Sequence, residues 1–129
     1  MSGLTYDQLI ISVTDNIDKN DKNRYFIALS GPPASGKSTI SENLAKDLSA
    51  KGYNSSILQM DGFHYDDLIL KEKKLLSKKG APETFDVMGL INFVSRLHKE
   101  DEVVIPIFDR SLELSRSSAV IISKNTKVI

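Results

Sequence analysis

One loop constrains the fold of this chain more than any other part of it. Residues 31–38 read GPPASGKS and match the pattern G-x-x-x-x-G-K-[ST] in full. An apolar run at residues 25–29 precedes the loop, and a helical run that Lys51 and Gly52 close follows it. The inward face of that helix is expected to consist of Ile40, Leu44, Ala45 and Leu48. A strand, this loop and a helix in that order predict a phosphate-binding loop.

The residue types of the loop suit the phosphates of a nucleotide. Glycines allow backbone N–H groups to curl around an anion, and the following helix adds the positive end of its dipole. Lys37 would reach the β- and γ-phosphates, the Ser38 hydroxyl would ligate Mg²⁺, and Thr39 would touch the α-phosphate. ATP and Mg²⁺ are therefore the predicted cofactors. The predicted nucleotide-binding residues are Gly31, Pro32, Pro33, Ala34, Ser35, Gly36, Lys37, Ser38 and Thr39.

Two alternatives to a phosphate-binding loop exist for this sequence. The first is a glycine- and serine-containing turn that ends in Lys-Ser by chance. The second is a dinucleotide-binding loop, which needs the pattern G-x-G-x-x-G, whereas position 33 is proline. The second alternative therefore fails on its own motif.

Hydrophobic periodicity predicts an α/β fold of one domain, with residues 1–23 as an N-terminal helix and connector. Thr5 and Gln8 form a potential capping box, and apolar residues then recur at helical spacing to about Ile17. Strands are expected at residues 25–29 and 55–60, and the helix between them implies that these strands are parallel.

Further elements are expected in the second half of the chain. Residues 68–79 are expected to form a helix or an irregular, lid-like segment. A helix follows at residues 86–99, and residues 102–108 read as a strand that Pro106 places at an edge or a bulge. Residues 119–122 could pair back on it as a hairpin. The inward residues of the helix are expected to be Leu90, Ile91, Val94 and Leu97.

Composition excludes several classes of protein. The 17 Lys and Arg residues balance 17 Asp and Glu residues, which argues against a protein that coats nucleic acid or anionic lipid. The absence of Cys excludes a disulfide scaffold, thiolate catalysis and a Cys-ligated zinc site. No apolar run approaches the ~18 residues of a membrane span, and no signal peptide is recognisable. A cytoplasmic protein with a small-molecule substrate is expected, and a homodimer is left open.

Asp61 is the candidate for the acid of the reaction. It closes the second expected strand within the sequence MDGFH, and ligands of open α/β sheets bind beyond the carboxyl ends of the strands. An aspartate there can accept the proton of a hydroxyl that attacks the γ-phosphate, or it can orient Mg²⁺ through water. The alternative is an aspartate that merely caps the turn with Gly62.

Four segments in this order resemble a known superfamily: the loop at residues 31–38, MDGFH at 60–64, KGAPETFD at 79–86 and IPIFDR at 105–110. The set is similar to the uridine kinase, phosphoribulokinase and bacterial pantothenate kinase superfamily, and looks closest to its fructokinase-like or pantothenate kinase-like branch. The resemblance covers residues 25–129. It implies a P-loop NTPase-type three-layer sandwich with a mostly parallel sheet, and Asp61 as the general base beside Lys37.

Departures from the uridine kinase pattern bear on the substrate. The aspartate that uridine kinases use for the ribose falls on Gly80 here, which disfavours a nucleoside. The resemblance then implies an ATP-dependent phosphotransferase that acts on a hydroxyl of a sugar, polyol or pantothenate-like alcohol. His64, Phe108 and Arg110 are the expected substrate-binding residues, with Arg110 available to pair an anionic group.

Three charged residues are left with open roles. Asp109 ends an apolar run and so suggests a Mg²⁺ ligand, but Pro106 favours a substrate-side or hairpin-stabilising role for it. Lys78 and Lys79 either touch phosphate or belong to a solvated, lysine-rich face.

The resemblance also implies that residues 127–129 begin a strand between the two expected parallel strands. We therefore expect a C-terminal part of the domain to be missing, and low stability and little transfer activity for this chain alone, because omitting a central strand leaves two unpaired edges. Two rival functions follow: a nucleotide-binding module without transfer activity, and an inactive remnant of a kinase. The sequence lacks a guanine-specific N-K-x-D motif, so a GTPase is not favoured.

Overall fold

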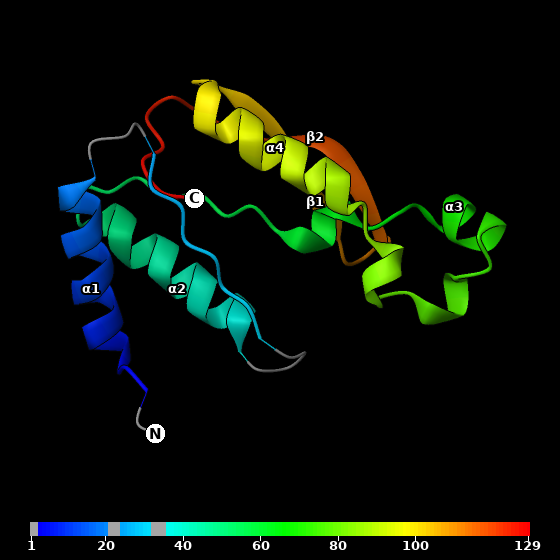
Figure 1. The fold of residues 1–129 in the computed structure, drawn as a ribbon, viewed down its shortest axis with the longest axis horizontal. Coiled ribbons are helices and arrows are strands. Elements are labelled where there is room, and N and C mark those ends of the chain that lie inside the picture. The colour runs from blue at the N-terminus through cyan, green and yellow to red at the C-terminus, as the bar shows by residue number, and fades with distance from the viewer. Residues whose placement is uncertain (1–2, 21–23, 32–35) are drawn as a thin grey trace. The chain divides into compact units, whose positions relative to one another are not determined.

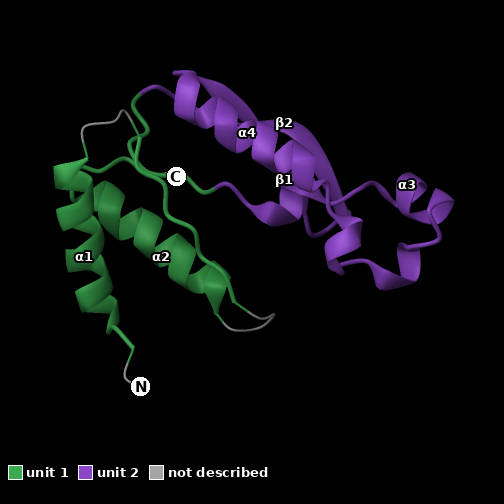
Figure 2. Ribbon diagram, viewed as in Figure 1, with its two compact units in different colours: residues 1–57, 125–129 green, residues 58–124 purple. Residues whose placement is uncertain are grey.

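The chain forms two compact units, each with buried apolar residues of its own. A computed structural model describes residues 3–20, 24–31 and 36–129. Unit 1 comprises residues 1–57 and 125–129, and unit 2 comprises residues 58–124 (Figure 2). Helices accompany a two-stranded sheet, which confirms the α/β class. None of the helices in the described ranges has the length and apolar character needed to cross a membrane.

Unit 1 contains two helices, α1 (Tyr6–Lys19) and α2 (Lys37–Ala50), shown in blue and cyan in Figure 1. The predicted capping box is present: the Gln8 amide donates to Thr5 Oγ1 at 3.2 Å, and the Thr5 amide donates to Gln8 Oε1 at 2.9 Å. That box begins α1. At the C-terminal end of α2, Lys51 is the C-cap and Gly52 adopts a φ of 94°, which favours glycine. The predicted limits of both helices are therefore confirmed to within two residues at the ends that these caps define.

The core of unit 1 lies between these helices and the C-terminal segment. Its buried members are Val13 of α1, Leu44 and Leu48 of α2, and Val128. Ile40 was expected to face inward with Leu44 and Leu48, and that expectation is wrong, because Ile40 is 40% exposed. Ile40 lies in the first turn of α2 and is not among the apolar residues that pack against the core of unit 1.

Three extended segments of unit 1 pair in parallel. Val128 forms isolated parallel bridges with both Tyr25 and Ser55. The Tyr25 amide donates to the Lys127 carbonyl at 2.8 Å, and the Ser56 amide donates to the Val128 carbonyl at 2.9 Å. Residues 127–129 therefore lie between the two segments, as the resemblance implied.

The strands expected at residues 25–29 and 55–60 are not formed at that length. Their ladder hydrogen bonds run only to residues 127–129, so each segment makes a bridge rather than a regular strand. Met60 belongs instead to a short 3₁₀ helix, η1 (Met60–Phe63), in unit 2. A strand needs a partner along its whole length, and the sequence pattern of one segment does not reveal how long its partner is.

Unit 2 is built on an antiparallel hairpin of β1 (Val103–Asp109) and β2 (Leu114–Ile122). Val103 pairs with Ile122 at one end, and Asp109 pairs with Leu114 at the other. The register shifts between Ile105 and Ile107. Pro106 lies at this irregularity, where its missing N–H group costs no ladder hydrogen bond. The predicted hairpin and bulge are both confirmed.

Helix α4 (Val87–Lys99) packs on this hairpin and on η1. Asp86 caps the helix by accepting a hydrogen bond from the Gly89 amide at 2.9 Å. Leu97 is buried, and Phe93 meets Phe63 of η1 edge to face with 5.6 Å between the ring centroids. The expectation that Ile91 faces inward is wrong: it is 53% exposed, because Phe93 completes the inward stripe on the other side of Leu90.

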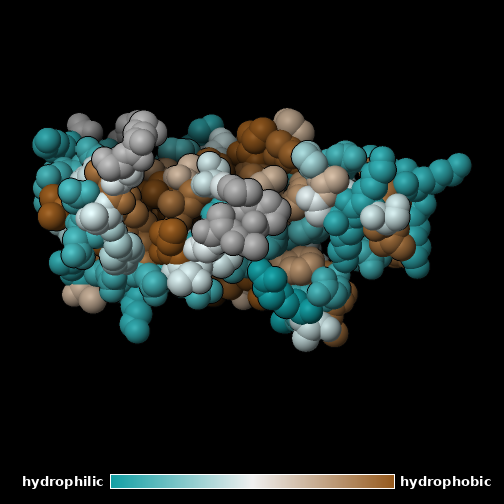
Figure 3. Space-filling model, turned by 90° about the horizontal axis from the view of Figure 1, so that it is seen from below, coloured by the Kyte–Doolittle hydropathy of each residue, from teal (hydrophilic) through white to brown (hydrophobic). Residues whose placement is uncertain are grey.

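The segment between η1 and α4 is partly helical, in agreement with the two forms expected for it. It contains α3 (Asp67–Glu72), η2 (Leu76–Lys78) and η3 (Pro82–Thr84). Leu70 anchors α3 as a fully buried side chain, whereas the lysines around it are exposed. In Figure 3, the end of the molecule that carries α3 is mostly hydrophilic. Polar side chains thus dominate the surface of this end.

Candidate functional site

The residues of the predicted phosphate-binding loop that the structure describes belong to unit 1. Gly36 is the N-cap of α2 with φ 86° and ψ 13°, a left-handed conformation that L-residues with a side chain rarely adopt. No side chain caps this end of α2, and its first turn holds no acidic residue. The first amides of the helix are therefore left to bind an anion. Four predicted site residues lie outside the described residues: Pro32, Pro33, Ala34 and Ser35.

Lys37 is bonded to the residue at which the predicted loop begins. Its ammonium donates a hydrogen bond to the Gly31 carbonyl at 2.5 Å. Ser38 and Thr39 follow as exposed residues in the first turn of α2. An ammonium, an exposed hydroxyl and uncapped amides form a donor set that fits a magnesium-bound triphosphate.

The predicted acid, Asp61, belongs to unit 2. Asp61 lies in η1 with its side chain 48% exposed, and its Oδ2 atom is 3.7 Å from a guanidinium nitrogen of Arg110. Gly62 follows and is buried; a Cβ atom at this position would lie 3.1 Å from the Pro106 carbonyl oxygen and 3.3 Å from Ile107 Cα. The absence of a side chain at position 62 therefore lets η1 rest directly on the backbone of β1.

His64 is held between two aromatic rings. Its ring centroid is 4.1 Å from that of Phe85 and 4.9 Å from that of Phe108, and the interplanar angles are 41° and 39°. The Nδ1 atom of His64 is 2.8 Å from the Asp61 carbonyl oxygen. Because a carbonyl oxygen only accepts, Nδ1 is the donor in this contact, which leaves Nε2 as the ring nitrogen that can face a ligand.

Backbone pairing explains how His64 comes to face Phe85. The two residues form an isolated antiparallel bridge, flanked by hydrogen bonds from the Tyr65 amide to the Thr84 carbonyl at 2.9 Å and from the Asp86 amide to the Phe63 carbonyl at 2.6 Å. The role of Phe85 was not predicted from the sequence. The only available signal was its place in the KGAPETFD segment, since these partners are far apart in the chain.

Within unit 2, the structure thus brings together Asp61 and all three predicted substrate residues. Phe108 stacks on His64, Arg110 is paired with Asp61, and Asp61 accepts from His64. Lys37, Ser38 and Thr39 belong to unit 1. Among the described residues, no group of three His, Cys, Asp or Glu side chains is arranged to hold a metal ion.

Asp109 stabilises the hairpin turn. Its Oδ1 atom accepts hydrogen bonds from the Ser111 hydroxyl at 2.7 Å and from the amides of Ser111 and Leu112, both at 3.0 Å. Its Oδ2 atom lies 3.5 Å from a guanidinium nitrogen of Arg116. Of the roles considered for Asp109, the contacts support the hairpin-stabilising one. The hydrogen bond from the Ser111 hydroxyl, together with those from the two amides, lowers the pKa of this carboxyl.

This lowered pKa predicts a pH dependence of stability. Asp109 should stabilise the native state above the unfolded-state pKa of about 3.9, and this contribution should disappear as the pH falls through the lower native-state pKa. We expect wild type to be more stable than Asp109→Asn at neutral pH and the difference to vanish in acid. Denaturant titrations of both proteins across this range measure it. A difference that is independent of pH would contradict the prediction.

Known proteins share both the sequence and the fold of this chain. A family model described as "Chromatin associated protein KTI12" matches residues 26–109. A pantothenate kinase of Streptococcus mutans serotype c is 34% identical over 109 residues, which cover 82% of this chain and 36% of the relative. A pantothenate kinase of Enterococcus faecalis is 33% identical over 91 residues, covering 68% of this chain and 30% of the relative.

A solved structure is similar over almost the whole chain. It is described as a fructose transport system kinase from Silicibacter sp. TM1040, and it superposes with a TM-score of 0.90 at 39% sequence identity. The match covers 98% of this chain and 61% of the solved one, while the chain spans about a third of the length of its curated relatives. The chain therefore belongs to the family described as chromatin associated protein KTI12, and it is related to the P-loop kinases of the pantothenate kinase and uridine kinase type.

Proposed function

We propose that this protein transfers the γ-phosphate of ATP to a hydroxyl group of a small metabolite. The observation that carries the proposal is the hydrogen bond from Lys37 to the Gly31 carbonyl at the uncapped start of α2. The relatives of the chain are named kinases. The three-layer P-loop arrangement around a mostly parallel sheet belongs to the same proposal.

The loop would hold the triphosphate by charge and by hydrogen bonds. The amides of the first turn of α2 would donate to phosphate oxygens, and Lys37 would exchange its bond with the Gly31 carbonyl for one with a phosphate. Ser38 would ligate Mg²⁺, which when bound supplies charge neutralisation, and Thr39 would contact the α-phosphate. Positioning and neutralisation of charge are the main contributions that a protein makes to phosphate transfer.

Asp61 would act as the general base. Its half-exposed carboxylate is accessible to a hydroxyl and is not engaged in a tight ion pair, since Arg110 is 3.7 Å away and is itself 77% exposed. Arg110 would be free to turn to an anionic group of the substrate. A proton transfer of this kind contributes a rate factor of about 10²–10⁴.

The acceptor would be a sugar, a polyol or a pantothenate-like alcohol. With Nδ1 engaged by the Asp61 carbonyl, Nε2 of His64 would be the ring nitrogen that hydrogen-bonds a substrate hydroxyl, and Phe108 offers an apolar wall beside it. A nucleoside is the alternative acceptor. Chromatin association, which the family description names, is not proposed for this chain, because 17 basic and 17 acidic residues provide no general attraction to nucleic acid.

An acceptor panel tests the proposal. The chain is incubated with Mg-ATP and with fructose, a linear polyol, pantothenate or uridine in turn, and ADP release is measured alongside ATP binding by calorimetry. We expect ADP release that depends on one of the first three acceptors. Tight ATP binding without acceptor-dependent release would support a nucleotide-binding module instead, and absence of ATP binding would support an inactive remnant.

A further inference from the structure

We propose that Lys79 is a positioning residue that holds Phe108, and through it His64, in place for the acceptor. The proposal rests on the proposed function for its effect on catalysis, but not for its effect on structure. Every residue that carries it belongs to unit 2.

Lys79 makes three contacts with three different parts of unit 2. Its ammonium donates to Asp67 Oδ1 of α3 at 2.9 Å and to the Glu113 carbonyl, next to β2, at 2.6 Å. It also lies 5.8 Å from the centroid of the Phe108 ring. The Lys79 side chain is only 23% exposed. One lysine thus ties α3, the hairpin turn and the end of β1 together.

The contact with Glu113 occurs at a strained position. Glu113 has a φ of 53°, in the left-handed region that residues with a side chain rarely adopt. Such a conformation costs of order 1–3 kcal/mol and persists only where surrounding contacts hold it. A charge-assisted hydrogen bond to the Glu113 carbonyl is a contact of this kind. Lys79 therefore helps to fix the path of the turn that carries Arg110.

Phe108 transmits this placement to the substrate residues. It pairs with Ser115 across the hairpin, and the Ser115 hydroxyl lies 3.3 Å from the His64 carbonyl oxygen and 3.5 Å from that of Asp61. The Phe108 ring also stacks on the His64 ring. A shift of the hairpin end would thus change the position of both the ring wall and the histidine.

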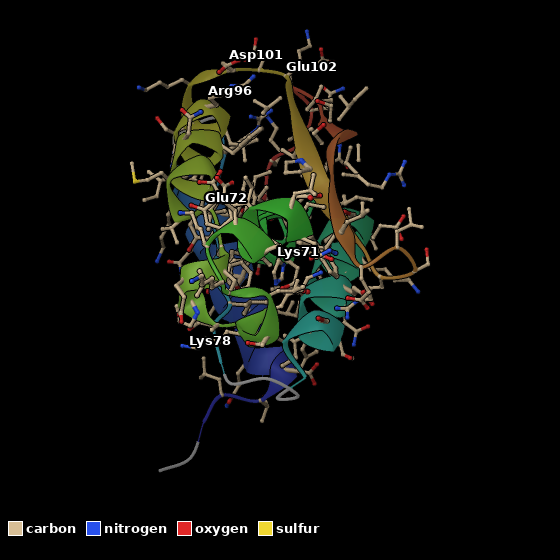
Figure 4. All side chains as sticks on the ribbon, turned by 90° about the vertical axis from the view of Figure 1, so that its right-hand side faces the viewer. Lys71, Glu72, Lys78, Arg96, Asp101 and Glu102 are labelled. Atoms are coloured by element: carbon tan, nitrogen blue, oxygen red, sulfur yellow. The ribbon has the colours of Figure 1, made fainter. Side chains whose placement is uncertain are left out.

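The neighbouring lysines differ from Lys79 in their surroundings. Lys71, Glu72 and Lys78 belong to the α3 and η2 segment labelled in Figure 4, and all three are exposed. The two interpretations left open for positions 78 and 79 therefore separate: position 78 belongs to the solvated face, whereas Lys79 is partly buried and bonded. Lys78→Met is accordingly the matched control for Lys79→Met.

Nuclear magnetic resonance tests the structural half of the proposal without any assay of activity. The chain has two histidines, so the ring protons of His64 can be compared with those of His98 as an internal reference. Stacked aromatic rings shield His64 in wild type. We expect Lys79→Met to move the His64 signals toward those of a free imidazole, with His98 unchanged. Lys79→Arg should largely restore them, and Lys78→Met should leave them as in wild type.

The outcomes of this experiment are distinct. Unmoved His64 signals in a folded Lys79→Met protein would overturn the proposal, and so would an equal shift in Lys78→Met. If Lys79→Met does not fold, Asp67→Asn weakens the same anchor without removing the lysine. A shift of His64 in the same direction then supports the proposal, and the absence of a shift overturns it.

Kinetics test the catalytic half. With the acceptor found in the panel, Lys79→Met should raise the KM for the acceptor about 10- to 100-fold and leave the KM for ATP unchanged. A general loss of folded protein would lower kcat and leave both KM values as they are, so this split separates positioning from stability. If no acceptor is phosphorylated while His64 still shifts, the proposed function fails and the placement by Lys79 stands.

Discussion

Lys37→Met should lower phosphate transfer by about 10²–10³-fold, the loss typical when one donor to a developing charge is removed. Among the described residues, the ammonium bonds to the Gly31 carbonyl, and the side chain is not part of the core of unit 1. We therefore expect the free energy of unfolding to change little. ATP binding by calorimetry, steady-state kinetics and a denaturant titration measure the three quantities.

Lys46→Met is the control for this change. Lys46 lies on the same helix and is exposed, so its loss removes an equal charge away from the loop. Transfer by the control should match wild type within about twofold, since surface charges far from a site contribute little. Equal losses in both variants would mean that general charge, and not the loop, holds the nucleotide.

Asp61→Asn should lower kcat by about 10²–10⁴-fold while ATP affinity remains that of wild type. Asparagine keeps the size of the side chain but accepts no proton, so this variant separates the chemical step from binding. The backbone carbonyl of residue 61, which receives the His64 ring, is unaffected by the change. Single-turnover kinetics and ATP titration together make the measurement.

Asp15→Asn serves as the control for Asp61→Asn because Asp15 is an exposed carboxylate within α1. If transfer persists at the wild-type rate, Asp61 is not the base. That result would support the alternative that Asp61 only caps the turn with Gly62.

The features that sequence predicted well are those that local chemistry determines. The capping box needs only Thr5 and Gln8, and the irregularity in β1 needs only the missing N–H group of Pro106. The start of α2 could be predicted from the loop motif, because the glycines and Lys37 of this motif bind phosphate only where a helix N-terminus follows them.

The features that sequence did not reveal depend on distant partners. Nothing in the residues around His64 indicates that Phe85 will stack on it, and Lys79 resembles the other lysines of its segment until its neighbours are placed. The extended segments at Tyr25 and Ser55 are short for the same reason, because a ladder is only as long as its partner. The grouping of Asp61 with its three candidate partners was expected only through the resemblance.

The bare backbone of Gly62 against β1 has a consequence for how this family can vary. Side chains accommodate a changed neighbour by rotating, but a Cβ atom at position 62 would meet backbone atoms of Pro106 and Ile107 at 3.1–3.3 Å, and backbone has no such freedom. A residue larger than glycine at position 62 would displace the acid beside it unless the bulge at Pro106 moved as well. These two positions should therefore change together among related chains, so that the base and the edge strand are inherited as one unit.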